Sequence, residues 1–467
     1  MNLQLVLLAV YSTLLVALGL WIGRRVESSS TFFVAGRRLG PIMLFATVLA
    51  ANIGAGSTVG AAGLGYRFGL SAWWWVGSAG LGTLALAWWV GPRIWRVAAE
   101  HDLQTVGDYL EHRYGNSVRV IIAALLWLGT LAILAGQLIA LAWVLDVVAG
   151  VPKVWGCLIG GAIVALYFAA GGLLTSAWVN LVQLVVLLAG FGAALVWVLG
   201  DLGGLAGIRD AVTDEPGFWH FGSNGSAGWI WLALLGPAFI ISPGLLQKAY
   251  GARDVRSIRL GIGAAGVALL GFAAVPPLLG MVARALDPEL ANPELALPTL
   301  LTTALPPLLG SLGLAAVVSA ELSSADAILF MLSTSFARDF YARHSDADPD
   351  DRSVLRVARL AAVGGGGLGV ALAIVLPSVV SSLSIFYSLL SVSLFVPVVA
   401  GLHSRRIGVP EALAAIGAGV SVLLWARLSE LTSPGSVWSP AFLGILASAL
   451  ACGVVLAFRS TRRKRRT

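Results

Sequence analysis

The stretch AANIGAGSTVG, residues 50–60, interrupts an apolar segment that spans residues 41–65. It places Asn52, Ser57 and Thr58 among glycines, where a lipid-facing helix would carry apolar side chains. Backbone that leaves the helical path at membrane depth persists only where protein or a water-filled cavity satisfies its N–H and C=O groups. Broken membrane helices of this kind place free carbonyl groups around a cation or a substrate. The stretch therefore predicts a membrane transporter that uses an ion.

The composition predicts an all-α polytopic membrane protein. Of 467 residues, 58% are hydrophobic and only 11% are charged, which is typical of a chain that crosses a bilayer many times. Apolar runs of about twenty residues mark membrane helices. Thirteen such segments are present, at 3–23, 41–65, 70–92, 119–147, 154–174, 177–200, 228–246, 259–283, 306–337, 357–376, 379–402, 409–427 and 437–458. The first has no small-residue cleavage site after it, so we expect it to remain as a helix.

Basic residues predict how these segments are oriented. If the N-terminus lies outside, the connections on the inner side and the tail at 459–467 hold 25 of the 30 basic residues, and the outer side holds five. The positive-inside rule favours this orientation. We therefore expect a multi-pass protein of the inner (plasma) membrane, with its N-terminus outside and its C-terminus in the cytoplasm. The basic tail indicates an anchor at anionic lipid, and the charge distribution gives no reason to expect a nucleic-acid partner.

A second broken helix predicts an internal repeat. The segment 228–246 contains Gly236-Pro237 and Ser242-Pro243-Gly244, which match the interruption in segment 41–65. Five is an odd number, so if each unit has five helices, the second unit enters the membrane from the side opposite to the first. Breaks at corresponding places in the two units therefore indicate inverted repeats, with a binding site where the two broken helices meet. Within a single transmembrane domain, residues 1–467, we expect the first repeat at 41–200 and the second at 228–402. The segment 3–23 and the segments in 409–458 are then peripheral.

Two carboxylates lie inside the segment 306–337. Glu321 is near its middle and Asp326 is a little more than one helical turn further on, and we expect no arginine or lysine at comparable depth in any helix. Ionisable side chains at this depth cost free energy and usually mark ion or proton paths. Helical spacing places small residues and hydroxyls together on one face between these carboxylates, namely Ala320, Ser323, Ser324 and Ala327. Oxygen atoms of this kind suit a hard cation such as sodium.

Other polar and aromatic residues in the apolar segments have two interpretations each. Asn180 and Gln137 are single amides that either hold helices together or serve a site. Tyr387 is a residue of the packed interior or of the site. The run Trp73-Trp74-Trp75 predicts an interfacial aromatic belt, although such residues also gate cavities.

These motifs resemble the bacterial sodium:solute symporter family, which includes sodium/proline, sodium/pantothenate and sodium/sugar transporters. The resemblance covers nearly the whole chain. It rests on FFVAGRRLGP (32–41), AANIGAGSTVG, YFAAGGLLTSAWVNLVQ (167–183), SPGLLQKAYGARD (242–254), and the spacing of Ala320 and Ser323-Ser324 before Asp339 and Tyr341. The resemblance implies a five-plus-five inverted-repeat core of the leucine-transporter type. It also implies import of a small organic solute by alternating access, with sodium as the coupling ion.

The resemblance further implies a set of sodium ligands. In that family the main sodium site joins backbone carbonyl groups of the first broken helix to hydroxyl groups of the eighth core helix. The matching carbonyl groups here are those of Ala50, Ile53 and Ala320, and the matching hydroxyl groups are those of Ser323 and Ser324.

One departure from the family concerns a second cation site. Many members carry an aspartate where this chain has Asn180, and a serine where it has Asp326. We therefore expect Asn180 and Asp326 to lie near one another and to shape cation binding, with Asp326 as a proton carrier the competing interpretation.

A second departure concerns the solute. Sugar-transporting members place a carboxylate in the third segment, where this chain has Trp75 and Val76, which argues against a hexose. The candidate solute-binding residues lie in the broken helices and their neighbours, namely Asn52, Ser57, Thr58, Ser78, Gln137, Phe239 and Tyr387.

Two alternatives to sodium-coupled import remain open at this point. The first is a proton-coupled symporter that uses Asp326 or Glu321. The second is a membrane sensor with the same fold. We expect no enzyme, because no nucleophile–base pair or metal cluster is evident among the apolar segments.

Overall fold

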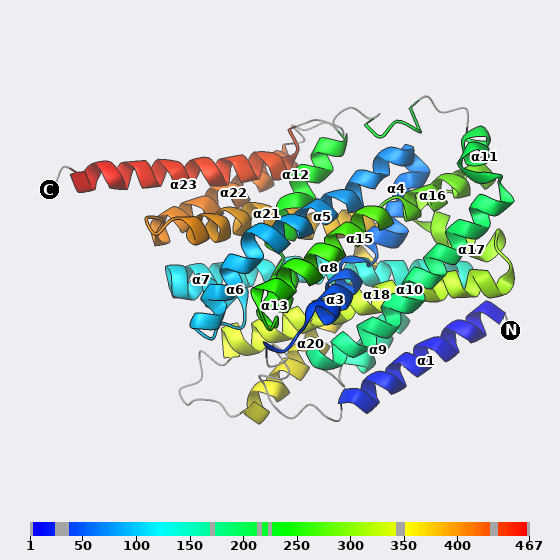
Figure 1. The fold of residues 1–467 in the computed structure, drawn as a ribbon, viewed down its shortest axis with the longest axis horizontal. Coiled ribbons are helices and arrows are strands. Elements are labelled where there is room, and N and C mark those ends of the chain that lie inside the picture. Colours follow the sequence, from blue (N-terminus) through cyan, green and yellow to red (C-terminus); the bar gives the residue numbers. More distant parts are fainter. Residues whose placement is uncertain are drawn as a thin grey trace.

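The fold is described from a computed structural model that covers residues 3–23, 37–168, 173–212, 217–222, 227–341, 351–429 and 438–464. The secondary-structure elements of the described residues are all helices. Most of them run along one axis and form an elongated bundle (Figure 1). Residues 32–36 of the FFVAGRRLGP motif and residues 465–467 of the basic tail lie outside the described residues.

The first broken helix begins with proline at its first turn and ends where the glycines start. Helix α3 covers Pro41–Asn52, and a π-helical turn, η2 (Gly56–Gly60), leads into α4 (Ala61–Phe68). The helix that continues from Gly56 is bent by 63° from α3, which confirms the interruption predicted from the sequence. The chain before and after it forms α1 (Leu3–Gly23), η3 (Gly69–Ala72), α5 (Trp73–Ala85), η4 (Leu86–Val90) and α6 (Gly91–Glu100).

The second broken helix consists of α12 (Ala227–Ile240) and α13 (Pro243–Tyr250). Its break falls at Ile241 and Ser242, because Pro243 has no N–H with which to continue the helical ladder. This break also confirms the prediction.

The remaining helices complete the bundle. Between the two broken helices lie α7 (Val106–Tyr114), α8 (Asn116–Ala149), α9 (Lys153–Phe168), α10 (Leu173–Asp201) and α11 (Gly204–Ala211). After α13 come α14 (Val255–Ser257), η5 (Ile258–Ile262), α15 (Gly263–Phe272), α16 (Val275–Leu286), η6 (Pro293–Leu295), α17 (Ala296–Thr303), α18 (Pro307–Ser335) and η7 (Phe336–Tyr341). The chain then forms α20 (Asp351–Val375), α21 (Val379–His403), α22 (Val409–Leu428) and α23 (Pro440–Lys464).

Membrane-spanning character is clear in most of these helices. Within the described residues, nine helices are long and apolar enough to cross a bilayer, or ten if the bent pair that starts with α3 counts as one span. Two shorter apolar helices, Leu3–Gly19 and Lys153–Leu166, occupy the first and fifth predicted segments. The predicted segments overlap helices wherever the chain is described, although residues 169–172 of segment 154–174 lie outside the described residues. Segments 41–65 and 70–92 both fall within the bent pair Pro41–Asn52 and Gly56–Glu100.

Helix α18 is the centre of the bundle. Of the most apolar stretch of α18, 83% is buried inside the protein, compared with 22% for that of α23. It packs against α10, α8 and α3, so its small residues and carboxylates face protein rather than lipid. Helices α1 and α23 lie at opposite edges of the bundle, and the two chain ends lie at opposite ends of it (Figure 1).

Candidate functional site

The break in α3 leaves carbonyl groups that the helix does not use. The last carbonyl groups of a helix have no intrahelical partner, and Ile53, which follows α3, is extended at φ −99° and ψ 98°. Further along, the Gly54 carbonyl accepts hydrogen bonds from the Ser57 N–H at 2.8 Å and the Thr58 N–H at 3.0 Å. The carbonyl groups of Ala50 to Ile53 are thus left at the end of a helix in the protein interior.

Helix α18 brings two hydroxyl groups to these carbonyl groups. The Ser323 hydroxyl lies 3.0 Å from the carbonyl oxygen of Ala50 and 3.0 Å from that of Ala320. The Ser324 hydroxyl lies 3.3 Å from the Ile53 carbonyl oxygen. The structure therefore brings together all five oxygen groups that the family resemblance names. Both hydroxyl groups donate to the carbonyl groups.

The close contact of α18 with the break requires a glycine at position 54. A Cβ atom at Gly54 would lie 2.3 Å from the Ser324 hydroxyl oxygen and 2.6 Å from the Gln137 amide oxygen. The Gln137 oxygen accepts the Ala55 N–H at 2.8 Å. Gln137 therefore serves the break directly, which the sequence left open between packing and function.

Glu321 lies beside the same break, and its carboxyl group contacts Thr58 rather than the α3 carbonyl groups. Its side chain is fully buried, and its Oε1 atom lies 2.8 Å from the Thr58 hydroxyl. The Thr58 hydroxyl also lies 3.0 Å from the Gly54 carbonyl oxygen. Glu321 and Thr58 thus link α18 to η2, on the far side of the break from α3.

Asp326 and Asn180 occupy two helices that pack together. Asp326 is on α18 and is 5% exposed, and Asn180 is on α10 and is fully buried. Helix α10 packs along α18. Their mutual arrangement, and any role in cation binding, stay predictions.

Lys248 corrects the expectation that no lysine or arginine lies at the depth of the carboxylates. The sequence placed it in an inner connection, but it belongs to helix α13, is 3% exposed, and interacts electrostatically with Asp326. Helix α13 packs against α18, which places Lys248 beside the helix that carries the two carboxyl groups.

A cavity of about 70 Å³ lies between the two broken helices and adjoins the oxygen cluster. Among the described residues, its wall includes Ala51 and Ser324 from the cluster. Five of the seven predicted solute-binding residues also line it, namely Asn52, Ser57, Gln137, Phe239 and Tyr387. The cavity thus joins the candidate cation ligands to candidate solute ligands.

The other two predicted residues lie outside this wall. The Thr58 hydroxyl is directed to Glu321 and the Gly54 carbonyl group. Ser78 is fully buried on α5, whose cavity-lining positions are Trp75, Val76 and Ala79.

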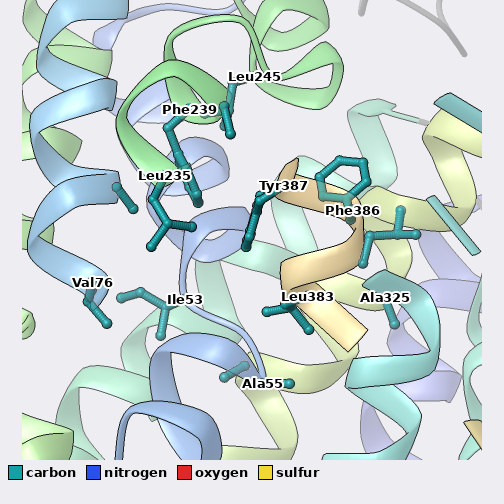
Figure 2. Packing of buried hydrophobic residues seen from close by; sticks show 14 of the residues in the cluster. Ile53, Ala55, Val76, Leu235, Phe239, Leu245, Ala325, Leu383, Phe386 and Tyr387 are labelled. Atoms are coloured by element: carbon teal, nitrogen blue, oxygen red, sulfur yellow. The ribbon is translucent and has the colours of Figure 1, made fainter. Parts of the chain in front are cut away.

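The cavity has an aromatic and aliphatic wall. The ring of Tyr387 lies 5.3 Å from that of Phe239 and 5.3 Å from that of Phe386, measured between centroids. Figure 2 shows these three side chains with Leu235 and Leu383, which come from α12 and α21. Trp75 also lines the cavity, and its indole N–H donates to the Gly56 carbonyl group at 2.9 Å. The tryptophan run therefore contributes one residue to the cavity and not only to an interfacial belt.

The sequence of the chain is similar to those of known transporters. The family model of the sodium:solute symporter family matches residues 32–419. The chain is 29% identical to the sodium/pantothenate symporter of Escherichia coli over 96% of this chain and 95% of that protein. It is 27% identical to the sodium/glucose cotransporter of Vibrio parahaemolyticus over 77% of this chain and 72% of that protein.

The fold is also shared with a solved structure. A Na⁺-coupled sialic acid symporter in a substrate-bound, outward-open state superimposes with a TM-score of 0.82 at 18% identity, over 97% of both chains. This similarity confirms the predicted leucine-transporter-type architecture. The relatives are transporters rather than enzymes, and they favour sodium coupling over a proton-coupled or sensory protein. The chain belongs to the sodium:solute symporter family and is a multi-pass membrane protein that couples sodium to solute transport.

Proposed function

We propose that the oxygen cluster between α3 and α18 binds the coupling sodium ion while the adjoining cavity binds a small organic solute for import. The ligands are the carbonyl groups of Ala50, Ile53 and Ala320 and the hydroxyl groups of Ser323 and Ser324. The observation that carries the proposal is the approach of both serine hydroxyl groups to the carbonyl groups at the break. Such oxygen groups suit a hard cation.

The position of this site gives sodium a means to shift the transport cycle. Its ligands come from the first broken helix and from α18, so a bound ion links the two. A ligand changes a conformational equilibrium only by its different affinities for the two states. Sodium that requires both helices in contact stabilises the state in which the cavity is formed, which is the outward-open state in our proposal, and the solute then follows.

The orientation of the protein in the membrane and its contact with lipid are part of the same proposal. The N-terminus lies outside the inner membrane and the C-terminus in the cytoplasm, as the 25 basic residues on one side favour. The bilayer surrounds the bundle, and exposed apolar side chains such as Leu128, Val185 and Leu450 contact its lipid. No nucleic acid takes part. The repeats 41–200 and 228–402 move relative to one another, with α1, α22 and α23 at the periphery.

The experiment that tests the sodium site is a thermal-stability titration of the purified protein in detergent. Sodium is compared with potassium and choline at constant ionic strength. A ligand that binds only the folded state stabilises it, by about 2.7 kcal/mol at a hundred times its Kd. We expect sodium alone to raise the Tm, and Ser323→Ala to abolish the shift.

The matched control is Ser311→Ala on the same helix. The Ser311 hydroxyl donates to the Pro307 carbonyl group at 2.7 Å, one helical turn away, so this variant should keep the sodium shift. Equal stabilisation by sodium, potassium and choline, or an unchanged shift in Ser323→Ala, would refute the assignment.

A further inference from the structure

Lys248 is a buried cation in the wall of the solute cavity. It lies on α13, two residues before the end of that helix, and is 3% exposed. It is also one of the cavity-lining residues. Burying an ammonium group costs free energy unless it is paired, and Asp326 on α18 supplies an opposite charge nearby.

The described part of the cavity wall contains no other charged side chain. Several of its polar groups already bond to the protein. Gln137 Oε1 accepts the Ala55 N–H at 2.8 Å, Trp75 Nε1 donates to the Gly56 carbonyl group at 2.9 Å, and the Asn52 amide donates to the Thr83 hydroxyl at 3.2 Å. Recognition of a charged group on the solute therefore falls to Lys248.

The sodium ligands border the same cavity. Ser324 lines the wall and also approaches the Ile53 carbonyl group. A sodium ion bound there and the Lys248 ammonium group put two positive charges at the edge of one cavity. The carboxyl groups of Asp326 and Glu321 lie on α18 outside the described wall, so the charged groups that a solute meets directly are both positive. They act in a low-dielectric interior, where Coulomb interactions are strong.

The remainder of the wall is apolar. Leu235, Phe239, Phe386 and Tyr387 line one side (Figure 2). Such a surface binds the hydrocarbon part of a ligand, whereas a few polar groups fix its orientation. A polyol would leave most of its hydroxyl groups without partners against this wall.

We propose that the transported solute is a small organic anion, a carboxylate with an apolar body, whose anionic group faces Lys248. This inference rests on the proposed sodium site, because sodium supplies the second positive charge. It predicts that sodium binding increases the affinity for the anion, and that the charge of the solute matters more than the shape of its polar end.

The test compares carboxylates with their own amides. Propionate, butyrate, phenylacetate and benzoate are each paired with the corresponding amide, and glucose and myo-inositol serve as neutral polyols. Stabilisation of the purified protein is measured in sodium and in potassium. We expect at least one carboxylate to stabilise the protein in sodium, and its amide to do so with about tenfold lower affinity, which corresponds to about 1.4 kcal/mol for the lost charge on the acceptor.

Two variants connect this preference to Lys248. Lys248→Arg keeps the charge and should keep the preference for the carboxylate. Lys248→Gln removes the charge and should bring the carboxylate and amide affinities together. If Lys248→Gln does not fold, the wild-type protein and Lys248→Arg still decide the question.

Two results would overturn the inference while leaving the sodium site intact. One is an amide or polyol that stabilises the protein as well as any carboxylate does. The other is no carboxylate effect in a protein that still shows its sodium shift. Loss of the sodium shift itself would instead count against the proposed function.

Discussion

The hydroxyl group of Ser323 lies 3.0 Å from the carbonyl oxygen of Ala50, although 273 residues separate them in the chain. This contact joins the end of α3 to the middle of α18. Neither helix can move relative to the other without changing it. A cation coordinated by both the Ser323 hydroxyl oxygen and the Ala50 carbonyl oxygen, with the hydroxyl hydrogen turned away, would connect the same two helices more strongly, because interactions with an ion are stronger than a hydrogen bond between neutral groups.

Replacement of Gly54 by alanine should abolish both sodium binding and uptake. The added Cβ atom would lie 2.3 Å from the Ser324 hydroxyl oxygen and 2.6 Å from the Gln137 amide oxygen. Overpacking of this kind costs about 1–3 kcal/mol, and here it displaces two groups at the break. The measurement is the sodium-dependent Tm shift. Gly192→Ala is the control, because nothing lies within 4 Å of a Cβ atom there. A normal sodium shift in Gly54→Ala would contradict the geometry.

The carboxylate of Asp326 should be transferable to position 180 without loss of sodium coupling. If the carboxylate has moved from α10 to α18 relative to other family members, the double variant Asn180→Asp with Asp326→Ser restores one carboxylate at the same place. We expect Asp326→Ser alone to weaken sodium-dependent uptake and the double variant to recover it, measured in proteoliposomes with an imposed sodium gradient. Loss of all coupling in the double variant would show that the two positions do not share a site.

Glu294 should make the stability of the protein depend on pH. It lies in η6, outside the membrane-spanning helices, and accepts the N–H groups of Val379 at 3.0 Å and Val380 at 3.1 Å. The Trp143 indole donates to it at 3.1 Å. Burial raises the pKa of Glu294 above its ordinary value of 4.5, against the opposing effects of these hydrogen bonds and of Lys153.

The sign of the effect follows from the raised pKa. A carboxyl group whose pKa is higher in the folded state contributes stability that is fully present below its unfolded pKa and is lost as the pH rises through its folded pKa. The Tm advantage of the wild-type protein over Glu294→Gln should therefore decrease as the pH rises from about 4.5. Glu289→Gln, at an exposed position in the same loop, should show no such trend. A Tm advantage that grows with pH would contradict the prediction.

Arg37 should hold the segment before α3 against α6 and α13. Its guanidinium group donates to the carbonyl groups of Tyr250 at 3.2 Å, Ala98 at 3.1 Å and Leu103 at 3.0 Å. A lysine ammonium group lacks the planar fork that reaches several acceptors at once. We expect Arg37→Lys to destabilise the protein by about 1–3 kcal/mol, at about 1 kcal/mol for each lost hydrogen bond.

The control for Arg37 is Arg96→Lys. Arg96 is exposed on α6, and a substitution that keeps its charge should leave the free energy of unfolding within about 0.5 kcal/mol of the wild-type value, with little change in Tm. Equal Tm values for both variants, measured by thermal denaturation in detergent, would show that the carbonyl contacts of Arg37 contribute little.

The sequence by itself determined the spans, the breaks and the segments that carry the candidate sodium ligands. Hydropathy over about twenty residues, and glycine or proline inside an apolar run, are local properties that need no partner to be recognised. For this reason the interruptions at residues 50–60 and at Pro243 were predicted correctly. The pairing of Ala50 with Ser323 came from the family resemblance, and the structure then placed the two groups in contact.

Only the tertiary structure decided which side chains share the cavity. Lys248 was predicted in an inner connection, but it is buried on α13, which packs against α18 near Asp326. Trp75 looked like one residue of an interfacial belt, but it lines the cavity and donates to Gly56. Thr58 was predicted as a solute-binding residue, and its hydroxyl donates to Glu321 and lies outside the described cavity wall. These contacts join residues far apart in the chain, and they depend on how helices cross and rotate, which periodicity along one helix does not specify.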